Sequence, residues 1–193
     1  MITLDSIQND EALRKEWFPI SRNEIFMGHA GVAPLPKAAV DALEAFIHRA
    51  TTENQEGDWT WEPVMDARRA AAELVGCEAD EIALLGPTSL GLNLVANGLE
   101  WSEGDEVVCY LDDYPANVYP WTKLDAFGVK PVLLQPEKPG IIDWPVVEAA
   151  LTERTRLVAL ASCNYLSGYR IPIDRIGREL QARGILFSLD GIQ

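Results

Sequence analysis

The sequence predicts an α/β fold of three layers, in which a mainly parallel sheet carries helices on both faces. Short apolar runs, partly β-branched, recur from about residue 80 onward, and such runs are typical of strands that are buried on both faces. Stretches of helical period separate most of these runs. Strands that alternate with helices are joined by right-handed crossovers into a parallel sheet, so the two observations together indicate this fold class.

The first 60 residues lack this alternation of strand and helix. The elements expected there are a short amphipathic helix, an extended segment and a longer Ala-rich helix, at 10–18, 24–27 and 35–51. We therefore assign residues 1–60 to an N-terminal arm or small-domain segment, and residues 61–193 to the first part of a large domain. Between the two, Trp59 and Trp61 are expected to serve as packing or interface aromatics.

The large domain is expected to begin with a helix at 63–75 and then to alternate. The strands are predicted at 82–85, 107–110, 131–134, 157–160 and 185–187, and the helices at 90–99, 121–127, 144–151 and 173–183. Gly128 and Gly184 follow two of these helices, where glycine commonly ends a helix.

Composition and net charge argue against nucleic-acid-binding and membrane proteins. The 193 residues are 48% hydrophobic, and 30 acidic against 16 basic side chains give a net charge of −14. Because such a field repels phosphate backbones and anionic lipid, we expect no nucleic-acid partner and no membrane partner. No apolar run approaches the roughly 20 residues of a membrane helix, and no signal-peptide pattern opens the chain, so a cytoplasmic location is expected.

Cysteine and histidine are scarce and scattered. Cys77, Cys109 and Cys163 lie far apart in or beside apolar segments, which indicates buried free thiols rather than a disulfide framework or a zinc site. With His29 and His48 as the two histidines, no metal centre is expected.

An acidic residue ends the last apolar run of the chain. Asp190 follows the strand expected at 185–187, and strand ends of open α/β sheets form the ligand crevice. Burying an unpaired carboxylate is costly, so Asp190 is expected to meet a cation or a hydrogen-bond donor. The alternative is a turn aspartate, a common use of Asp-Gly.

A turn that suits an anion precedes the helix expected at 90–99. Its residues 86–89 read Gly-Pro-Thr-Ser, and a helix N-terminus with two hydroxyls offers donors to a phosphate or carboxylate. The alternative is an ordinary N-cap formed by Thr88 or Ser89. The turn lacks the Gly-Lys-Ser/Thr ending of a P-loop and the glycine spacing of a dinucleotide-binding fingerprint.

Two further polar segments follow strands of the same sheet. Tyr114 either covers a flat ligand or is a half-buried loop aromatic, and Asn164 either bonds a ligand oxygen or holds its turn. With Thr88, Ser89, Asp190 and Gln193, they are expected along one rim. A flat heteroaromatic phosphate would use every one of these groups, and a carboxylate beside a pyridine nitrogen keeps that nitrogen protonated.

With these motifs the chain resembles the class V aminotransferases of fold type I, a family that includes cysteine desulfurases, kynureninase-like and isopenicillin N epimerase-like enzymes. The resemblance is carried by residues 26–36, 88–96, 114–121, 163–168 and 190–193. The order and spacing of these motifs are specific for the superfamily but do not select a reaction within it.

The resemblance implies pyridoxal 5′-phosphate (PLP) as cofactor. It implies that Thr88 and Ser89 hold the phosphate, and that Tyr114 stacks on the ring where many desulfurase-like relatives have histidine. By the same resemblance Asn164 and Gln193 approach the ring hydroxyl, and Asp190 pairs with the pyridinium nitrogen. The turn Ala30-Gly31 would lie near the substrate carboxylate with His29 beside it, and the alternative for His29 is a capping or packing role.

The chain departs from the family at the catalytic lysine. The family's Schiff-base lysine is expected some tens of residues after the Asp-x-x-Gln motif, and none of the lysines has a matching context: Lys15, Lys37, Lys123, Lys130 and Lys138. We therefore assign no catalytic residue, and expect an incomplete large domain that is inactive alone.

Complete relatives would be homodimers acting on amino acids or related amines by transamination, desulfuration, epimerisation or elimination. The alternative is a non-catalytic module that binds PLP, a phosphorylated metabolite or a partner chain. A nucleotide-binding α/β protein is disfavoured by the absent glycine fingerprint.

Overall fold

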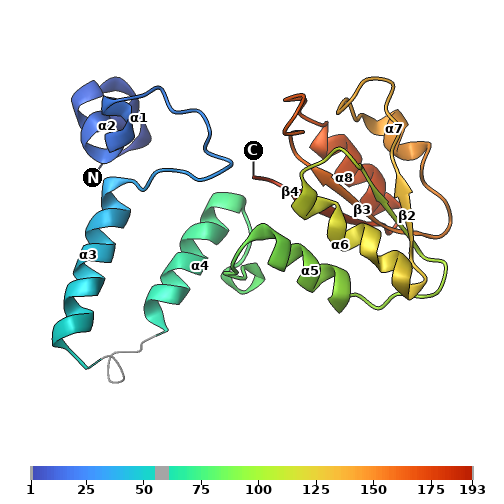
Figure 1. The fold of residues 1–193 in the computed structure, drawn as a ribbon, viewed down its shortest axis with the longest axis horizontal. Coiled ribbons are helices and arrows are strands. Elements are labelled where there is room, and N and C mark those ends of the chain that lie inside the picture. The colour runs from blue at the N-terminus through green and yellow to red at the C-terminus, as the bar shows by residue number, and fades with distance from the viewer. Residues whose placement is uncertain (1, 55–60, 193) are drawn as a thin grey trace. The chain divides into compact units, whose positions relative to one another are not determined.

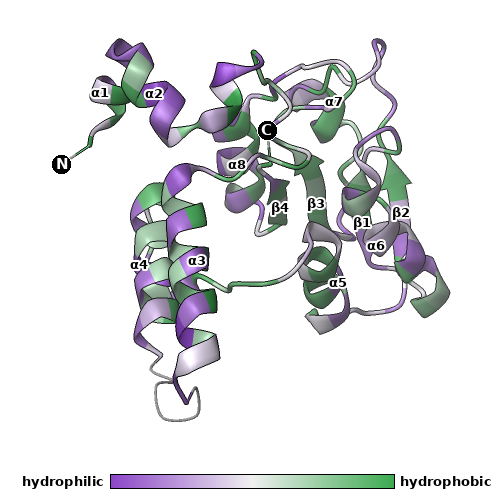
Figure 2. Cartoon of the chain, turned by 60° about the vertical axis from the view of Figure 1, so that its left-hand side comes forward, coloured by the Kyte–Doolittle hydropathy of each residue, from purple (hydrophilic) through white to green (hydrophobic). Residues whose placement is uncertain are grey.

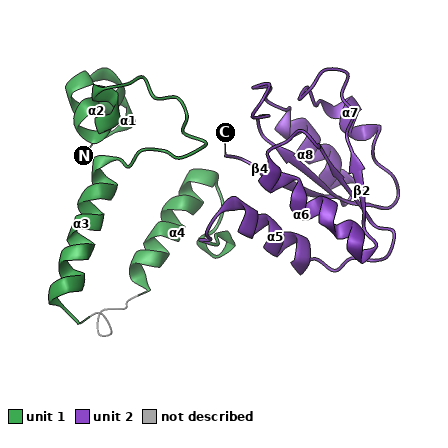
Figure 3. Cartoon of the chain, viewed as in Figure 1, with its two compact units in different colours: residues 1–83 green, residues 84–193 purple. Residues whose placement is uncertain are grey.

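A computed structural model describes residues 2–54 and 61–192 of the chain, which divides into two compact units, residues 1–83 and 84–193 (Figure 3). The unit boundary falls later than the division expected at residue 60. Helix α4 (Glu62–Val75) packs against the 3₁₀ helix η2 (Ala79–Glu81), so both belong to the first unit. The roles assigned to residues 1–60 and 61–193 stay a prediction.

The first unit is helical in the residues that the structure describes. Besides α4 and η2 it contains α1 (Leu4–Asn9), α2 (Glu11–Trp17), η1 (Pro19–Arg22) and α3 (Lys37–Thr52). These confirm the helices expected at 10–18, 35–51 and 63–75, whereas α1 was not predicted. The segment 24–27 is irregular. Trp61 precedes α4 with its side chain 73% exposed, and Trp59 lies outside the described residues.

The second unit is built on a parallel sheet of four strands in the order β2-β1-β3-β4 (Figure 1). The strands are β1 (Glu106–Cys109), β2 (Lys130–Leu133), β3 (Thr155–Ala161) and β4 (Leu186–Asp190). They confirm four of the five expected strands. The register sets Ala161 at the end of β3 opposite Asp190 at the end of β4.

The prediction of a strand at 82–85 is wrong. The segment forms no ladder with any strand that the structure describes, and Leu84 and Leu85 are about half exposed, at 53% and 52%. An apolar run becomes a strand only where a neighbouring strand accepts its backbone hydrogen bonds, and that neighbour is a property of the tertiary fold rather than of the run.

Helices cover both faces of the sheet, as expected for a three-layer α/β fold. Successive side chains of a strand point to opposite faces, so Val107 and Cys109 face one layer while Val108 and Tyr110 face the other. The first layer contains α5 (Thr88–Gly98), α6 (Tyr119–Thr122) and η4 (Lys123–Phe127), and the second contains α7 (Trp144–Glu148) and α8 (Ile173–Ala182). Figure 2 shows the hydrophobic strands between helices of mixed polarity.

Three smaller expectations concern thiols, metals and membranes. Cys77, Cys109 and Cys163 are free thiols. Cys109 is buried as expected, whereas the expected burial is wrong for Cys77 and Cys163, which are partly exposed. Among the described residues no group of side chains is arranged to hold a metal ion. None of the helices described is both long and apolar enough to span a bilayer.

Candidate functional site

The carboxyl ends of β1, β3 and β4 are tied together by hydrogen bonds between their loops. The side-chain amide of Asn164, after β3, donates from Nδ2 to the main-chain oxygen of Asp112, after β1, at 3.1 Å. The N–H of Ser162 donates to the main-chain oxygen of Asp190 at 2.8 Å. The structure therefore brings the segments of Tyr114, Asn164 and Asp190 to one rim of the sheet.

Asp190 is buried, with 7% of its surface exposed. Its Oδ1 accepts the main-chain N–H of Ile192 at 3.1 Å, so the Asp-Gly turn of the alternative interpretation is present. Its Oδ2 accepts no hydrogen bond from any residue that the structure describes. Oδ2 keeps some exposed surface, so a ligand can reach it, and a charged carboxylate oxygen without a donor is suited to a protonated ligand nitrogen.

Thr88 and Ser89 are the first two residues of α5, and the expected alternative that one of them is the N-cap is wrong. Pro87 occupies the N-cap, no side chain caps this helix, and neither hydroxyl has a partner among the described residues. Both residues are exposed. Two free hydroxyls and the unpaired N–H groups of the first helical turn together suit an anion such as a phosphate.

Helix α5 packs against η3 (Pro115–Asn117), the short 3₁₀ helix that follows Tyr114. Tyr114 is 52% exposed, and its ring meets the ring of Tyr165 edge-on with 5.5 Å between centroids. The half-exposed ring thus presents aromatic surface that a flat ligand can cover.

Asn164 mainly holds its own turn, which is the second of the two roles expected for it. Its Oδ1 accepts the N–H groups of Leu166 and Ser167, at 3.2 and 3.0 Å, and the Ser167 hydroxyl at 3.1 Å. Since Nδ2 already donates one hydrogen to Asp112, one N–H is left for a ligand oxygen.

Asp113 is a buried rim residue that sequence reasoning did not single out. Its Oδ1 accepts the N–H of Tyr114 at 2.8 Å, and its Oδ2 accepts the N–H of Ala161 at 2.9 Å and Nδ2 of Asn117 at 3.3 Å. Burial raises the pKa of Asp113, these hydrogen bonds oppose the rise, and the charge of Asp190 adds to it. The signal in the sequence was its position in the loop after β1, directly before Tyr114.

The remaining predicted residues are placed as follows. Gln193 lies outside the described residues. His29, Ala30 and Gly31 belong to the first unit, where Gly31 closes a turn by donating its N–H to the main-chain oxygen of Gly28 at 3.1 Å. The exposed His29 ring meets the ring of Phe26 edge-on at 5.0 Å, which is the packing role expected as its alternative. Their part in substrate binding stays a prediction.

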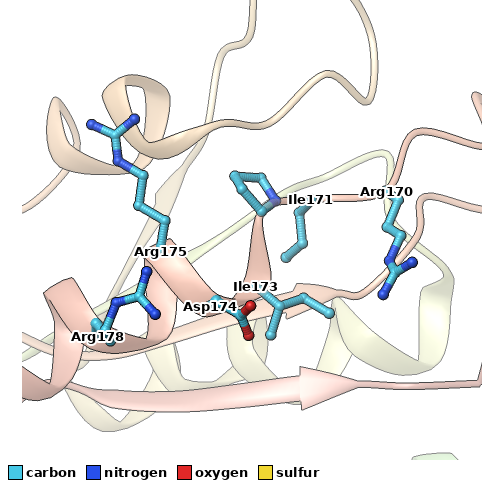
Figure 4. Close-up of a pocket in the computed structure, with 7 residues that line it drawn as sticks. Arg170, Ile171, Ile173, Asp174, Arg175 and Arg178 are labelled. Carbon is cyan, nitrogen blue, oxygen red and sulfur yellow. The ribbon is translucent and has the colours of Figure 1, made fainter.

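A pocket lies at the start of α8 (Figure 4). This pocket of about 390 Å³ contains none of the predicted site residues. It is lined by Ile171, Pro172 and Ile173, by Asp174, and by three exposed arginines that form no ion pair within the described part of the chain, Arg170, Arg175 and Arg178.

Solved structures share this fold. A C-DES mutant with glycine covalently linked to its PLP cofactor superposes with a TM-score of 0.80 at 21% identity, over 93% of this chain and 49% of that one. The apo cysteine desulfurase of Thermococcus onnurineus matches with a TM-score of 0.74 at 20% identity, over 98% of this chain and 47% of that one.

Curated relatives are similar in sequence as well. A probable cysteine desulfurase of Methanothermobacter thermautotrophicus is 27% identical over 188 residues, which are 95% of this chain and 47% of the relative. The cysteine desulfurase IscS of Anaeromyxobacter sp. is 30% identical over 177 residues, 88% of this chain and 44% of the relative. This chain thus spans about half the length of the curated relatives it matches.

The family model described as aminotransferase class-V matches residues 25–193, which include every rim segment described above. The chain belongs to the class V aminotransferase family.

Proposed function

We propose that this chain provides the PLP-binding rim of an enzyme of the cysteine desulfurase kind that acts on amino acids. The observation that carries the proposal is Asp190 at the end of β4, beside the loops of Tyr114 and Asn164. It is a buried residue, and its Oδ2 has no donor within residues 2–54 and 61–192. An unprotonated ring nitrogen has no hydrogen to donate and would leave this oxygen without a partner, whereas a pyridinium N–H would donate a charge-assisted hydrogen bond to it.

The other rim residues fit the remaining parts of PLP. The free hydroxyls of Thr88 and Ser89 suit its phosphate, the half-exposed ring of Tyr114 suits its ring face, and Asn164 has one N–H for the ring oxygen. Gln193 is proposed for the same oxygen. PLP, when bound, supplies an electron sink for negative charge at the substrate carbon, and Asp190 keeps the proton on the ring nitrogen on which this depends.

Our proposals for substrate, assembly and location rest on the family relationship rather than on the rim residues. We propose an amino acid substrate whose carboxylate meets His29, Ala30 and Gly31, a homodimer in the cytoplasm, and desulfuration as the reaction, because the relatives reported above are cysteine desulfurases. We also propose that the Schiff-base lysine is not among residues 1–193, since no lysine has the family context.

Titration of the purified chain with PLP, followed by the visible absorbance of the cofactor, tests the proposal. The expected result is saturable binding that the exchange Asp190→Asn weakens at least about tenfold, because a charge-assisted hydrogen bond is lost. Asp174→Asn, an exposed carboxylate on α8, is the control and is expected to bind as the unchanged chain does. Equal affinity of the Asp190→Asn variant and the unchanged chain would contradict the proposal.

A second candidate function is binding of an anionic metabolite without catalysis, and the pocket at the start of α8 favours it. Three arginines without an ion pair among the described residues line this pocket, so it offers positive charge that the overall field of a chain of net charge −14 does not. Their guanidinium groups point in different directions, and the Asp174 carboxylate lies among them (Figure 4). The double exchange of Arg175 and Arg178 to alanine separates the candidates. It is expected to leave PLP affinity unchanged if PLP binds at the rim, and to abolish phosphate binding if the pocket is the site.

A further inference from the structure

Asp113 is the centre of a buried chain of hydrogen bonds. Its two carboxylate oxygens accept from three N–H groups, those of Tyr114, Ala161 and the Asn117 side chain, at 2.8, 2.9 and 3.3 Å. Asn117 in turn accepts the indole N–H of Trp121 at 3.2 Å. Asp113 is 5% exposed, and Asn117 and Trp121 are fully buried.

The three donors come from two parts of the rim. Tyr114 and Asn117 belong to the loop after β1, whereas Ala161 is the last residue of β3 and pairs in register with Asp190. One carboxylate therefore fastens the Tyr114 loop to the strand pair that presents Asp190. Without it, three N–H groups at this end of the sheet would lose their acceptor.

We infer that Asp113 is a positioning residue that holds the ring of Tyr114 over the ligand site at the ends of β3 and β4. It acts through Tyr114, because its Oδ1 binds the backbone N–H of that residue directly. The part of the inference that concerns PLP rests on the proposed function, whereas the fastening of the loop to β3 does not.

The chemistry of the site requires a carboxylate rather than an amide. An amide has one acceptor oxygen, so in Asp113→Asn at least one of the three donors would face an NH₂ group instead of an oxygen. Asp112→Asn is a matched control, since Asp112 is the adjacent residue and is exposed. Within the described residues its side chain accepts one long hydrogen bond, from the Tyr110 hydroxyl at 3.4 Å.

Amide hydrogen exchange tests the fastening without any cofactor. Asp113→Asn is expected to speed exchange at the N–H of Ala161 or Tyr114 at least about tenfold relative to the unchanged chain, while Asp112→Asn leaves both rates as they are. Unchanged rates at both N–H groups in Asp113→Asn would overturn the inference. If this variant does not fold, Trp121→Phe takes its place, because it removes the indole N–H at the far end of the hydrogen-bonded chain and leaves the Asp113 carboxylate intact. Faster exchange at Tyr114 then supports the inference, and an unchanged rate overturns it.

A double-mutant cycle on PLP affinity tests whether Asp113 acts through Tyr114. Tyr114→Ala is expected to weaken binding about tenfold by removing the aromatic surface, and Asp113→Asn several-fold. If Asp113 positions Tyr114, the double variant binds no more weakly than Tyr114→Ala alone. Losses that multiply would show independent action and overturn the inference. If the unchanged chain binds no PLP, the proposed function fails, while the exchange experiment still decides the fastening.

Discussion

Gly140 is in close contact with the turn of Asn164, and replacing it with alanine tests this contact. Gly140 lies in the loop between β2 and α7 with a φ of +75°, and its N–H donates to the Tyr110 hydroxyl at 2.9 Å. A Cβ built on Gly140 would lie 2.7 Å from Oδ1 of Asn164 and would also collide with the Ser167 hydroxyl. The exchange therefore forces either the loop or the turn of Asn164 to move.

Gly168 provides a matched control in the same turn. Its φ is +69°, and a Cβ there would meet nothing within 4 Å. Gly168→Ala is expected to lower the free energy of unfolding by about 1–2 kcal/mol, because alanine is strained in the left-handed backbone conformation. Gly140→Ala carries the same backbone cost and adds overpacking of about 1–3 kcal/mol, so we expect a loss of about 2–5 kcal/mol.

Urea denaturation followed by tryptophan fluorescence measures both losses, since Trp121 and Trp144 are buried in the second unit. The close contact predicts that Gly140→Ala loses at least about 1 kcal/mol more than Gly168→Ala. Equal losses in the two variants would show that Gly140 does not pack against Asn164 and would refute the reasoning.

Three further predictions concern reactivity, packing and the helix start. Burial raises the pKa of the Cys109 thiol to about 12, so at pH 8 its thiolate fraction is roughly a thousandfold below that of an ordinary thiol. A thiol reagent should therefore label Cys163 but not Cys109 in the folded chain, and mass spectrometry that finds early labelling of Cys109 would contradict this. Ile176→Ala removes a fully buried side chain between α8 and the sheet and should lower the free energy of unfolding, measured by urea denaturation, by about 2–5 kcal/mol. Leu186→Ala, at a site that is 46% exposed, should lower it by less than about 1 kcal/mol. Thr88→Ala should change stability by less than about 0.5 kcal/mol, because the hydroxyl caps nothing, yet should weaken PLP binding; a loss near 1 kcal/mol would indicate a cap after all.

Sequence patterns predicted the architecture well wherever the signal is local. The apolar runs of β1 and β3 are buried on both faces, so their hydrophobicity is continuous and easily recognised. Alternation of these runs with helical stretches was enough to predict a parallel sheet with helices on both faces. The run at 82–85 has the same local signal but lacks a partner strand among the described residues, and pairing cannot be deduced from one segment.

The rim was predicted in outline because the carboxyl ends of parallel strands meet at one edge. That rule brought Tyr114, Asn164 and Asp190 together, as the structure shows, although their roles toward a ligand stay predictions. The role of Asp113 could not be deduced in the same way. Its importance depends on the N–H of Ala161, 48 residues away in the chain, and such a contact leaves no periodic signal in the sequence.

The most direct test of the central claim is a crystal structure of the chain soaked with PLP. We expect the phosphate at the hydroxyls of Thr88 and Ser89, the ring against Tyr114, and the ring nitrogen within hydrogen-bond distance of Oδ2 of Asp190. PLP bound in the arginine-lined pocket at the start of α8, with Oδ2 of Asp190 left without a donor, would contradict it.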